Sequence, residues 1–135
     1  MDLQKQQRLV IDALEDAKAR DIKVFNTTHL TSMFDRIIIV SGTSTRQTRA
    51  IASHVVEVVR KQKIPIIAEE GTETAEWVLI DIGDIVIHIM QPSIRRYYDL
   101  EEIWGDKPVR VKLLPESTVP VTDEPARYDD PSWSM

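Results

Sequence analysis

Residues 70–104 read EGTETAEWVLIDIGDIVIHIMQPSIRRYYDLEEIW, and this stretch decides the fold. Side chains at 77–82 and again at 85–90 alternate with a period of two, which is typical of β-strands. The tetrapeptide Asp-Ile-Gly-Asp between the two runs predicts a hairpin turn in which Gly83 takes the positive φ. We expect Ile82 at the exposed tip of this hairpin. An isolated exposed isoleucine is ordinary, whereas one close to Trp and Tyr residues favours a partner site.

The segment after the hairpin is predicted to be helical. Pro92 suits the first turn of a helix. Asp99 with Glu102 offers a second helix start, so the segment can divide into two short helices near Tyr98. Aromatic residues are concentrated in the whole stretch, which indicates either a corner of the core or a recognition face. They are Trp77, Tyr97, Tyr98 and Trp104.

The residues upstream predict the rest of an α/β fold. An amphipathic pattern over 3–18 predicts a helix that covers a sheet. Residues 37–40 are all apolar, as in a strand buried on both faces. A second helix starts at a Ser44–Gln47 capping box, and strands are expected at 22–25 and, on an edge, at 64–68. The pattern therefore predicts a mixed five-stranded sheet with helices on both faces.

Composition limits the classes of function. At 135 residues, 42% hydrophobic and 29% charged, the chain is expected to form one domain with a single core. The absence of cysteine excludes disulfides, thiol catalysis and cysteine-ligated zinc. No apolar run is long enough to span a membrane and the N-terminus is unlike a secretory signal, so we expect a cytoplasmic location. The net charge of −5 disfavours direct nucleic-acid binding and suits a basic protein partner.

No motif predicts an active site, a cofactor or a metal ion. Residues 42–44 stand at a strand-to-helix junction that could hold a phosphate, but a strand exit followed by a helix N-cap explains every residue. Asp81 and Asp84 flank a turn, where aspartate bonds to nearby backbone, so we expect structural roles. His88 is expected to be a partly buried histidine whose hydrogen bonds are satisfied.

Five motifs in order resemble the ribosomal silencing factor family, also called RsfS or Iojap-like. They are Asp35 before the apolar strand, SGTSTRQ at 41–47, Glu70-Gly71, WVLIDIGDIVIH at 77–88 and RYYDLEEIW at 96–104. The resemblance covers roughly residues 3–104. It implies a nucleotidyltransferase-like fold without catalysis, since the metal-binding carboxylate pair of such enzymes is missing here.

The resemblance implies a translational repressor. Such a protein binds the large ribosomal subunit through ribosomal protein fourteen (the L-fourteen family) and sterically blocks joining of the small subunit. Family members damp translation under nutrient limitation, and some are linked to maturation of the large subunit.

The resemblance also implies a partner-binding face that falls on eight residues of this chain. The apolar members act as anchors and the acidic members meet basic residues of the partner. On this basis Tyr98→Ala and Ile82→Asp are each expected to weaken ribosome binding and to leave the fold intact. The eight residues are Trp77, Ile82, Tyr98, Leu100, Glu70, Asp81, Asp99 and Glu101.

The sequence also allows two alternative functions, and it leaves the role of the C-terminal segment undecided. The alternatives are a large-subunit assembly factor and, with less support, a nucleotidyltransferase-like phosphate-binding enzyme that uses 41–44. Self-association of the chain through an unoccupied apolar face is also plausible. We expect a family domain at 1–106 and an extension at 107–135. Within it, 109–114 is expected to form an extra strand or a segment along the surface, and the acidic, proline-containing residues from Pro115 onward to be disordered.

Overall fold

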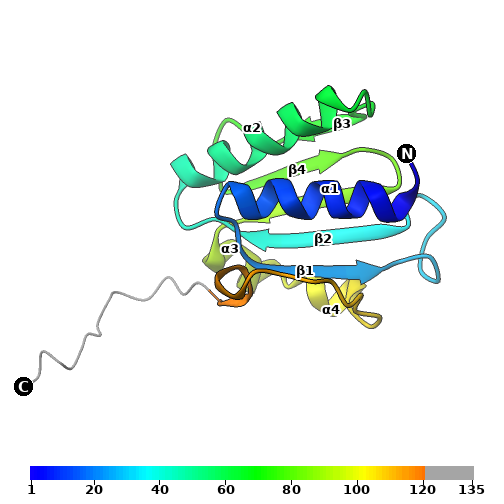
Figure 1. The fold of residues 1–135 in the computed structure, drawn as a ribbon. Coiled ribbons are helices and arrows are strands. Elements are labelled where there is room, and N and C mark those ends of the chain that lie inside the picture. The colour runs from blue at the N-terminus through cyan, green and yellow to red at the C-terminus, as the bar shows by residue number, and fades with distance from the viewer. Residues whose placement is uncertain (121–135) are drawn as a thin grey trace, which may run out of the picture.

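A five-stranded sheet forms the centre of the molecule in the computed structural model, which describes residues 1–120 (Figure 1). The predicted order of helices and strands is confirmed. The elements are α1 (Leu3–Asp16), β1 (Arg20–Asn26), β2 (Arg36–Ser41), α2 (Thr45–Lys61), β3 (Ala68–Glu70), β4 (Trp77–Asp81), β5 (Ile85–Met90), α3 (Pro92–Tyr98), α4 (Leu100–Trp104) and the 3-10 turn η1 (Pro115–Thr118).

The sheet is mixed, as the sequence predicts. Its strand order is β1-β2-β5-β4-β3, and only β2 and β5 pair in parallel within the described residues. These two central strands are buried along almost their whole length. Alternate residues point to opposite faces, so Ile38 and Ile87 enter one core, whereas Ile37 and Ile39 enter another. The continuous apolar run in β2 is therefore required by burial on both faces.

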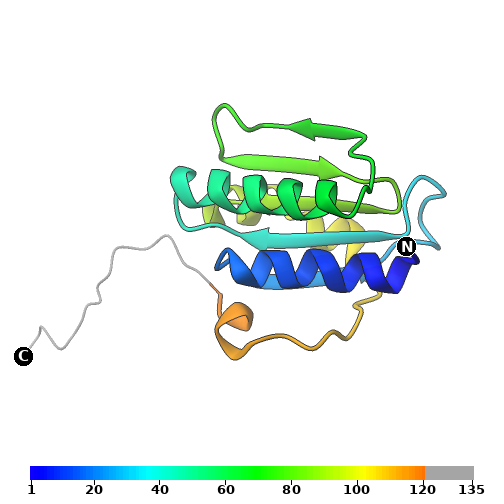
Figure 2. The same ribbon diagram turned by 45° about the horizontal axis from the view of Figure 1, so that its top comes forward.

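Helices α1 and α2 cover one face of this sheet, and Figure 2 shows them side by side over it. The valine-rich α2 is helical because Ile51, Val55 and Val59 are fully buried against the strands, which offsets their modest helix propensity. Its start agrees in part with the predicted capping box. The Gln47 amide donates to Ser44 Oγ (3.1 Å), but the Gln47 side chain accepts from Thr43 instead of from Ser44.

Helices α3 and α4 cover part of the opposite face. Leu100 and Trp104 of α4 pack on a smaller core around Ile37, Ile39 and Met90. The predicted division of the helical segment near Tyr98 and the start of the second helix at Asp99 are confirmed, but the predicted capping hydrogen bond is absent. Asp99 lies between the helices in the left-handed region (φ 49°), and its side chain makes no capping hydrogen bond.

Ile82 is buried, so its predicted exposure at the hairpin tip is wrong. The turn itself forms as expected, with Gly83 at φ 100°. However, Ile82 has the same strand parity as Ile80, and it points toward the face that α1 and α2 cover. Only 5% of its surface is exposed, and it belongs to the main core. A turn residue can thus be a core residue when its side chain points to the side of the sheet that carries the main core.

The edge strand β3 is shorter and later than predicted. Pro65 lacks a backbone N–H, and regular pairing begins only at Ala68, opposite Asp81. Before it, the Ile67 amide donates to the Asp81 carbonyl (2.7 Å). The side chain of Ile67 is 65% exposed.

Residues 107–114 run along the surface and cover the free edge of β1 (Figure 2). The Asn26 amide donates to the Lys107 carbonyl (2.9 Å), and the Val109 amide donates to the Val24 carbonyl (2.8 Å). The surface-segment expectation is therefore confirmed, with one isolated bridge at Phe25 and Pro108 in place of a full strand. Three of its side chains pack on the main core: Val109, Val111 and Leu113.

The extension continues into the turn η1. Glu15 of α1 accepts from the Leu114 amide (2.6 Å) and from Ser117 Oγ (2.8 Å). The disorder predicted from Pro115 onward is therefore wrong for Pro115–Thr118. The same prediction for residues 121–135 falls outside the described residues, and the division of the chain at 106 stays a prediction.

The burial of Ile82 gives a direct test of the fold. The expectation from sequence that Ile82→Asp leaves the fold intact is therefore wrong. This variant places a carboxylate in the main core, so we expect the free energy of unfolding to fall by about 3 kcal/mol or more. Ile67→Asp makes the same change on the exposed side of the neighbouring edge, and we expect less than about 1 kcal/mol. Urea denaturation followed by circular dichroism measures both. Equal stabilities for the two variants would contradict the packing described for Ile82.

Candidate protein-binding face

Trp77 lies at the centre of a row of rings, which pack at tilted or edge-on angles on the sheet face that α3 and α4 cover only in part. It begins β4, and strand pairing places Leu79 opposite His88, so Trp77 and His88 are diagonal neighbours on one face. Trp77 Nε1 donates to His88 Nδ1 (2.9 Å), and the two ring centroids are 5.8 Å apart. The indole N–H is therefore satisfied within the protein, which leaves its half-buried ring for apolar contact.

His88 is a neutral hydrogen-bond acceptor beneath this ring. Burial lowers its pKa from the ordinary value of 6.5 to about 4, because the charged form loses its hydration. Since Nδ1 accepts the bond from Trp77, we assign the ring proton to Nε2. The expectation of a hydrogen-bonded histidine is confirmed at Nδ1, but His88 is buried more deeply than the predicted partial burial, with 7% of its surface exposed.

Two tyrosines at the end of α3 continue the row into solvent. The Tyr98 ring packs on Trp77 with centroids 4.9 Å apart, and Tyr97 meets Tyr98 edge-on at 5.0 Å. Tyr98 is 49% exposed and Tyr97 is 80% exposed. Exposed aromatic rings that are held in place by stacking have the character of interface anchors, because little side-chain entropy remains to be lost on binding.

The structure divides the other predicted site residues into two groups. Leu100 is half-buried and begins α4. Asp99, at the corner between Tyr98 and Leu100, is exposed. Glu70 is exposed on β3 and pairs with Leu79, two residues from Trp77. These three residues can share a surface with the aromatic row.

Three predicted residues have other roles in the fold. Ile82 is in the core, as described above. Asp81 lies at the far end of β4 from Trp77, and its Oδ1 accepts from the Gly83 amide (2.8 Å) within the turn, as the structural interpretation predicts. Glu101 forms a bidentate ion pair with Arg95, with both N–O distances 3.1 Å.

Sequence reasoning missed Tyr97 and Arg95. Tyr97 belongs to the same aromatic pair as Tyr98, and only the turn of α3 shows that both rings are outside the core. Arg95 is 6% exposed although arginine is rarely buried. The sequence places Glu101 six residues after Arg95, which was the available signal for their contact. Helical periodicity could not predict this contact, because the left-handed Asp99 between the two residues interrupts the helix.

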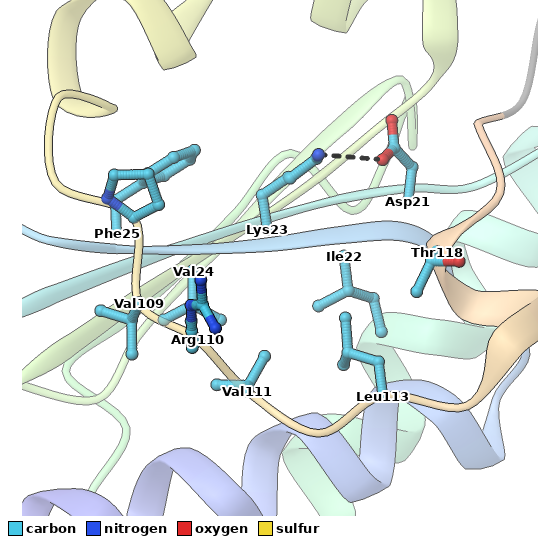
Figure 3. Close-up of a pocket in the computed structure, with 11 residues that line it drawn as sticks. Asp21, Ile22, Lys23, Val24, Phe25, Val109, Arg110, Val111, Leu113 and Thr118 are labelled. Atoms are coloured by element: carbon cyan, nitrogen blue, oxygen red, sulfur yellow. Dashed lines mark ion pairs between the residues drawn. The ribbon is translucent and has the colours of Figure 1, made fainter.

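A groove of about 240 Å³ lies elsewhere, between β1 and the extension (Figure 3). Figure 3 shows Ile22 and Val24 on the side of β1 that faces Val111 and Leu113, and the Lys23–Asp21 ion pair (4.0 Å) on the opposite side of β1. Its walls are mainly aliphatic, and no group of three or more His, Cys, Asp or Glu residues in 1–120 could hold a metal ion. Among the same residues, no helix is long and apolar enough to cross a membrane.

Comparison with known proteins identifies the family. A family model described as "Ribosomal silencing factor during starvation" matches residues 1–133. The chain belongs to the ribosomal silencing factor family. This family consists of non-enzymatic ribosome silencing factors that regulate translation in association with the ribosome, so the expectation that the chain is not an enzyme is confirmed.

Individual relatives agree with this assignment. Ribosomal silencing factor RsfS of Chromobacterium violaceum is 45% identical over 105 residues, which cover 78% of this chain and 86% of that protein. A crystal structure of a protein from the same organism superimposes with a TM-score of 0.77 at 40% identity, over 87% of this chain and 98% of the other. A mouse protein named "Mitochondrial assembly of ribosomal large subunit protein 1" is 33% identical over 71% of this chain and 43% of its own length.

The state of His88 predicts how stability depends on pH. Its pKa is lower in the folded protein, so the unfolded chain binds a proton first as pH falls from 6.5 to 4. The free energy of unfolding should therefore decrease across this window, by on the order of 2–3 kcal/mol from this residue. His88→Asn keeps an acceptor near Trp77 Nε1 and does not titrate. Urea denaturation at several pH values should give a flatter profile for this variant, and parallel profiles would contradict the assignment.

Proposed function

We propose that this protein represses translation by binding the large ribosomal subunit and sterically blocking its union with the small subunit. The contact runs through ribosomal protein fourteen (the L-fourteen family), and the repression operates under nutrient limitation. The proposal joins the family membership with a feature of this chain, the contact between the half-buried Trp77 ring and the exposed Tyr98 ring. No chemistry is needed, because occupation of the joining surface is sufficient.

The aromatic pair carries the proposal. Trp and Tyr are enriched among the residues that dominate binding energy, and here their rings are positioned before a partner arrives. Leu100 adds aliphatic surface at the border of the smaller core. We infer that Trp77, Tyr98 and Leu100 form the apolar centre of the contact, and that Ile82 contributes only through the fold because its side chain is buried.

Charge supports a basic protein as the partner. The chain carries a net charge of −5. Glu70, which precedes Trp77 in the sequence, and Asp99, which follows Tyr98, are both exposed. Such carboxylates would meet lysines or arginines of the partner and orient the encounter. The same charge disfavours a large direct contact with ribosomal RNA. Asp81 is placed less favourably, because it lies four residues along β4 from Trp77.

The remaining features of the proposal follow from the family resemblance. We place the protein in the cytoplasm, assign it a nucleotidyltransferase-like topology, and allow for a homodimer that forms when the aromatic face is not occupied by the ribosome. A second candidate function, assembly of the large subunit, is favoured by the name of the mouse relative.

Sedimentation of purified ribosomal subunits through a sucrose gradient, with and without the protein, tests the proposal. We expect the protein to migrate with the large subunit and the amount of joined ribosomes to fall. Migration with the large subunit without any loss of joining would favour the assembly function. Failure to migrate with the large subunit would contradict both.

Variants at matched positions test the proposed face. Tyr98→Ala removes a ring that contributes on the order of 2 kcal/mol, so we expect affinity for the large subunit to fall about 30-fold. Leu114→Ala is the control, because Leu114 is also 49% exposed but lies on the C-terminal extension. Equilibrium binding to labelled large subunits measures both variants. Wild-type affinity in a folded Tyr98→Ala protein would defeat the assignment of this face.

A further inference from the structure

Arg95 is a buried guanidinium at the base of the proposed binding face. It lies in the last turn of α3, and its side chain is 7% exposed. Its Nη1 donates to the Asp21 carbonyl and to Ser41 Oγ, both at 2.8 Å, and Asp21 Oδ2 lies 3.7 Å away. The Nε and Nη2 groups donate to Glu101. One side chain thus joins α3 to β1, to the end of β2 and to the first turn of α4.

The backbone around these contacts is shaped to receive Arg95. Asp21 has φ 53°, and the pairing of β1 with β2 shifts register between Arg20 and Lys23. This bulge turns the Asp21 carbonyl toward the guanidinium. A β-bulge commonly redirects a group in this way, at the cost of regular pairing. The guanidinium is therefore held on the sheet side independently of Glu101.

The same arginine fixes the corner between α3 and α4. Asp99 is left-handed, and its amide donates to the Arg95 carbonyl (2.9 Å). Two residues later, Glu101 closes the ion pair with the Arg95 side chain. Helix α4 has five residues and no side-chain cap, so it depends on tertiary contacts to form. Arg95 therefore holds the residues on both sides of Asp99, which are Tyr98 and Leu100.

We propose that Arg95 and Glu101 are positioning residues for the partner-binding face, and that Glu101 acts through Arg95 without contacting the partner. This inference rests on the proposed function, because it assigns both residues a role in partner binding. Its structural basis is the ion pair between Arg95 and Glu101. Because both Glu101 oxygens accept from Arg95, its charge is already neutralised. Glu101 therefore differs from Glu70, which is exposed.

A double-mutant cycle in large-subunit binding tests the proposal. We expect Arg95→Gln and Glu101→Gln each to weaken binding about tenfold, and the double variant to be no weaker than either, because both changes release the same corner. Glu70→Gln is the matched control for a carboxylate that meets the partner. It should reduce the salt dependence of binding, whereas Glu101→Gln should leave that dependence unchanged. Additive losses together with a reduced salt dependence for Glu101→Gln would overturn the proposal.

A measurement without ribosomes separates this inference from the proposed function. The NMR shifts of the Tyr98 ring protons report its stacking on Trp77. They should move toward solvent-exposed values in Arg95→Gln and Glu101→Gln at temperatures where both remain folded, and stay unchanged in Glu70→Gln. If Arg95→Gln fails to fold, Ser41→Ala replaces it in this test. Ser41→Ala removes one hydrogen bond of Arg95, so we expect the Tyr98 ring shifts to move in the same direction by a smaller amount.

The two claims therefore fail in different ways. If the ring shifts move as expected but the wild-type protein does not bind the large subunit, the proposed function fails and the positioning of Tyr98 by Arg95 stands. If Tyr98→Ala loses binding while folded Arg95→Gln and Glu101→Gln proteins bind normally with unchanged ring shifts, the positioning role fails and the proposed function stands.

Discussion

The structure depends on burying the parallel pair β2 and β5 on both faces. Their aliphatic side chains point alternately to opposite sides, so a single helix layer cannot keep them from water. Helices α1 and α2 supply a full layer on one side. On the other side the cover is two short helices, whose packing residues include Leu100 and Trp104. Because this second layer is short, aromatic surface remains at its border, where Trp77 and Tyr98 stack.

At this border the same residues serve the fold and, in the proposed function, the contact with the partner. The Trp77 ring is held from below by the hydrogen bond to neutral His88, and from the side by Tyr98. Arg95 holds the corner from which Tyr98 projects. A contact that is prepared in this way loses little conformational entropy on binding. For a protein whose proposed action is steric exclusion, such a rigid face is the essential part, and the rest of the chain is the support that presents it.

Sequence reasoning succeeded where one local rule decides the outcome. Alternation in 77–82 and 85–90, the apolar run at 37–40 and Gly83 in the turn gave the hairpin, the central strand and the order of elements. It failed where a distant group competes for the same residue. Ile82 is buried because it belongs to the main core, which residues distant in sequence complete. Glu101 faces Arg95 because the left-handed Asp99 lies between α3 and α4. Pro115–Thr118 is ordered, contrary to the predicted disorder, because Glu15 of α1 accepts hydrogen bonds from the Leu114 amide and from Ser117 Oγ, a distant contact that composition does not encode.

Site-specific photo-cross-linking from position 97 tests the central claim most directly. Tyr97 is beside the Trp77–Tyr98 pair and largely exposed, so a benzoylphenylalanine there leaves the stack intact. The matched probe replaces Arg60, which is exposed on α2 and therefore lies on the helix layer of the opposite face. With purified large subunits, the account predicts a cross-link from position 97 to ribosomal protein fourteen, and none from position 60. Cross-linking from position 97 to a different ribosomal component, or equal cross-linking from both positions, would contradict it.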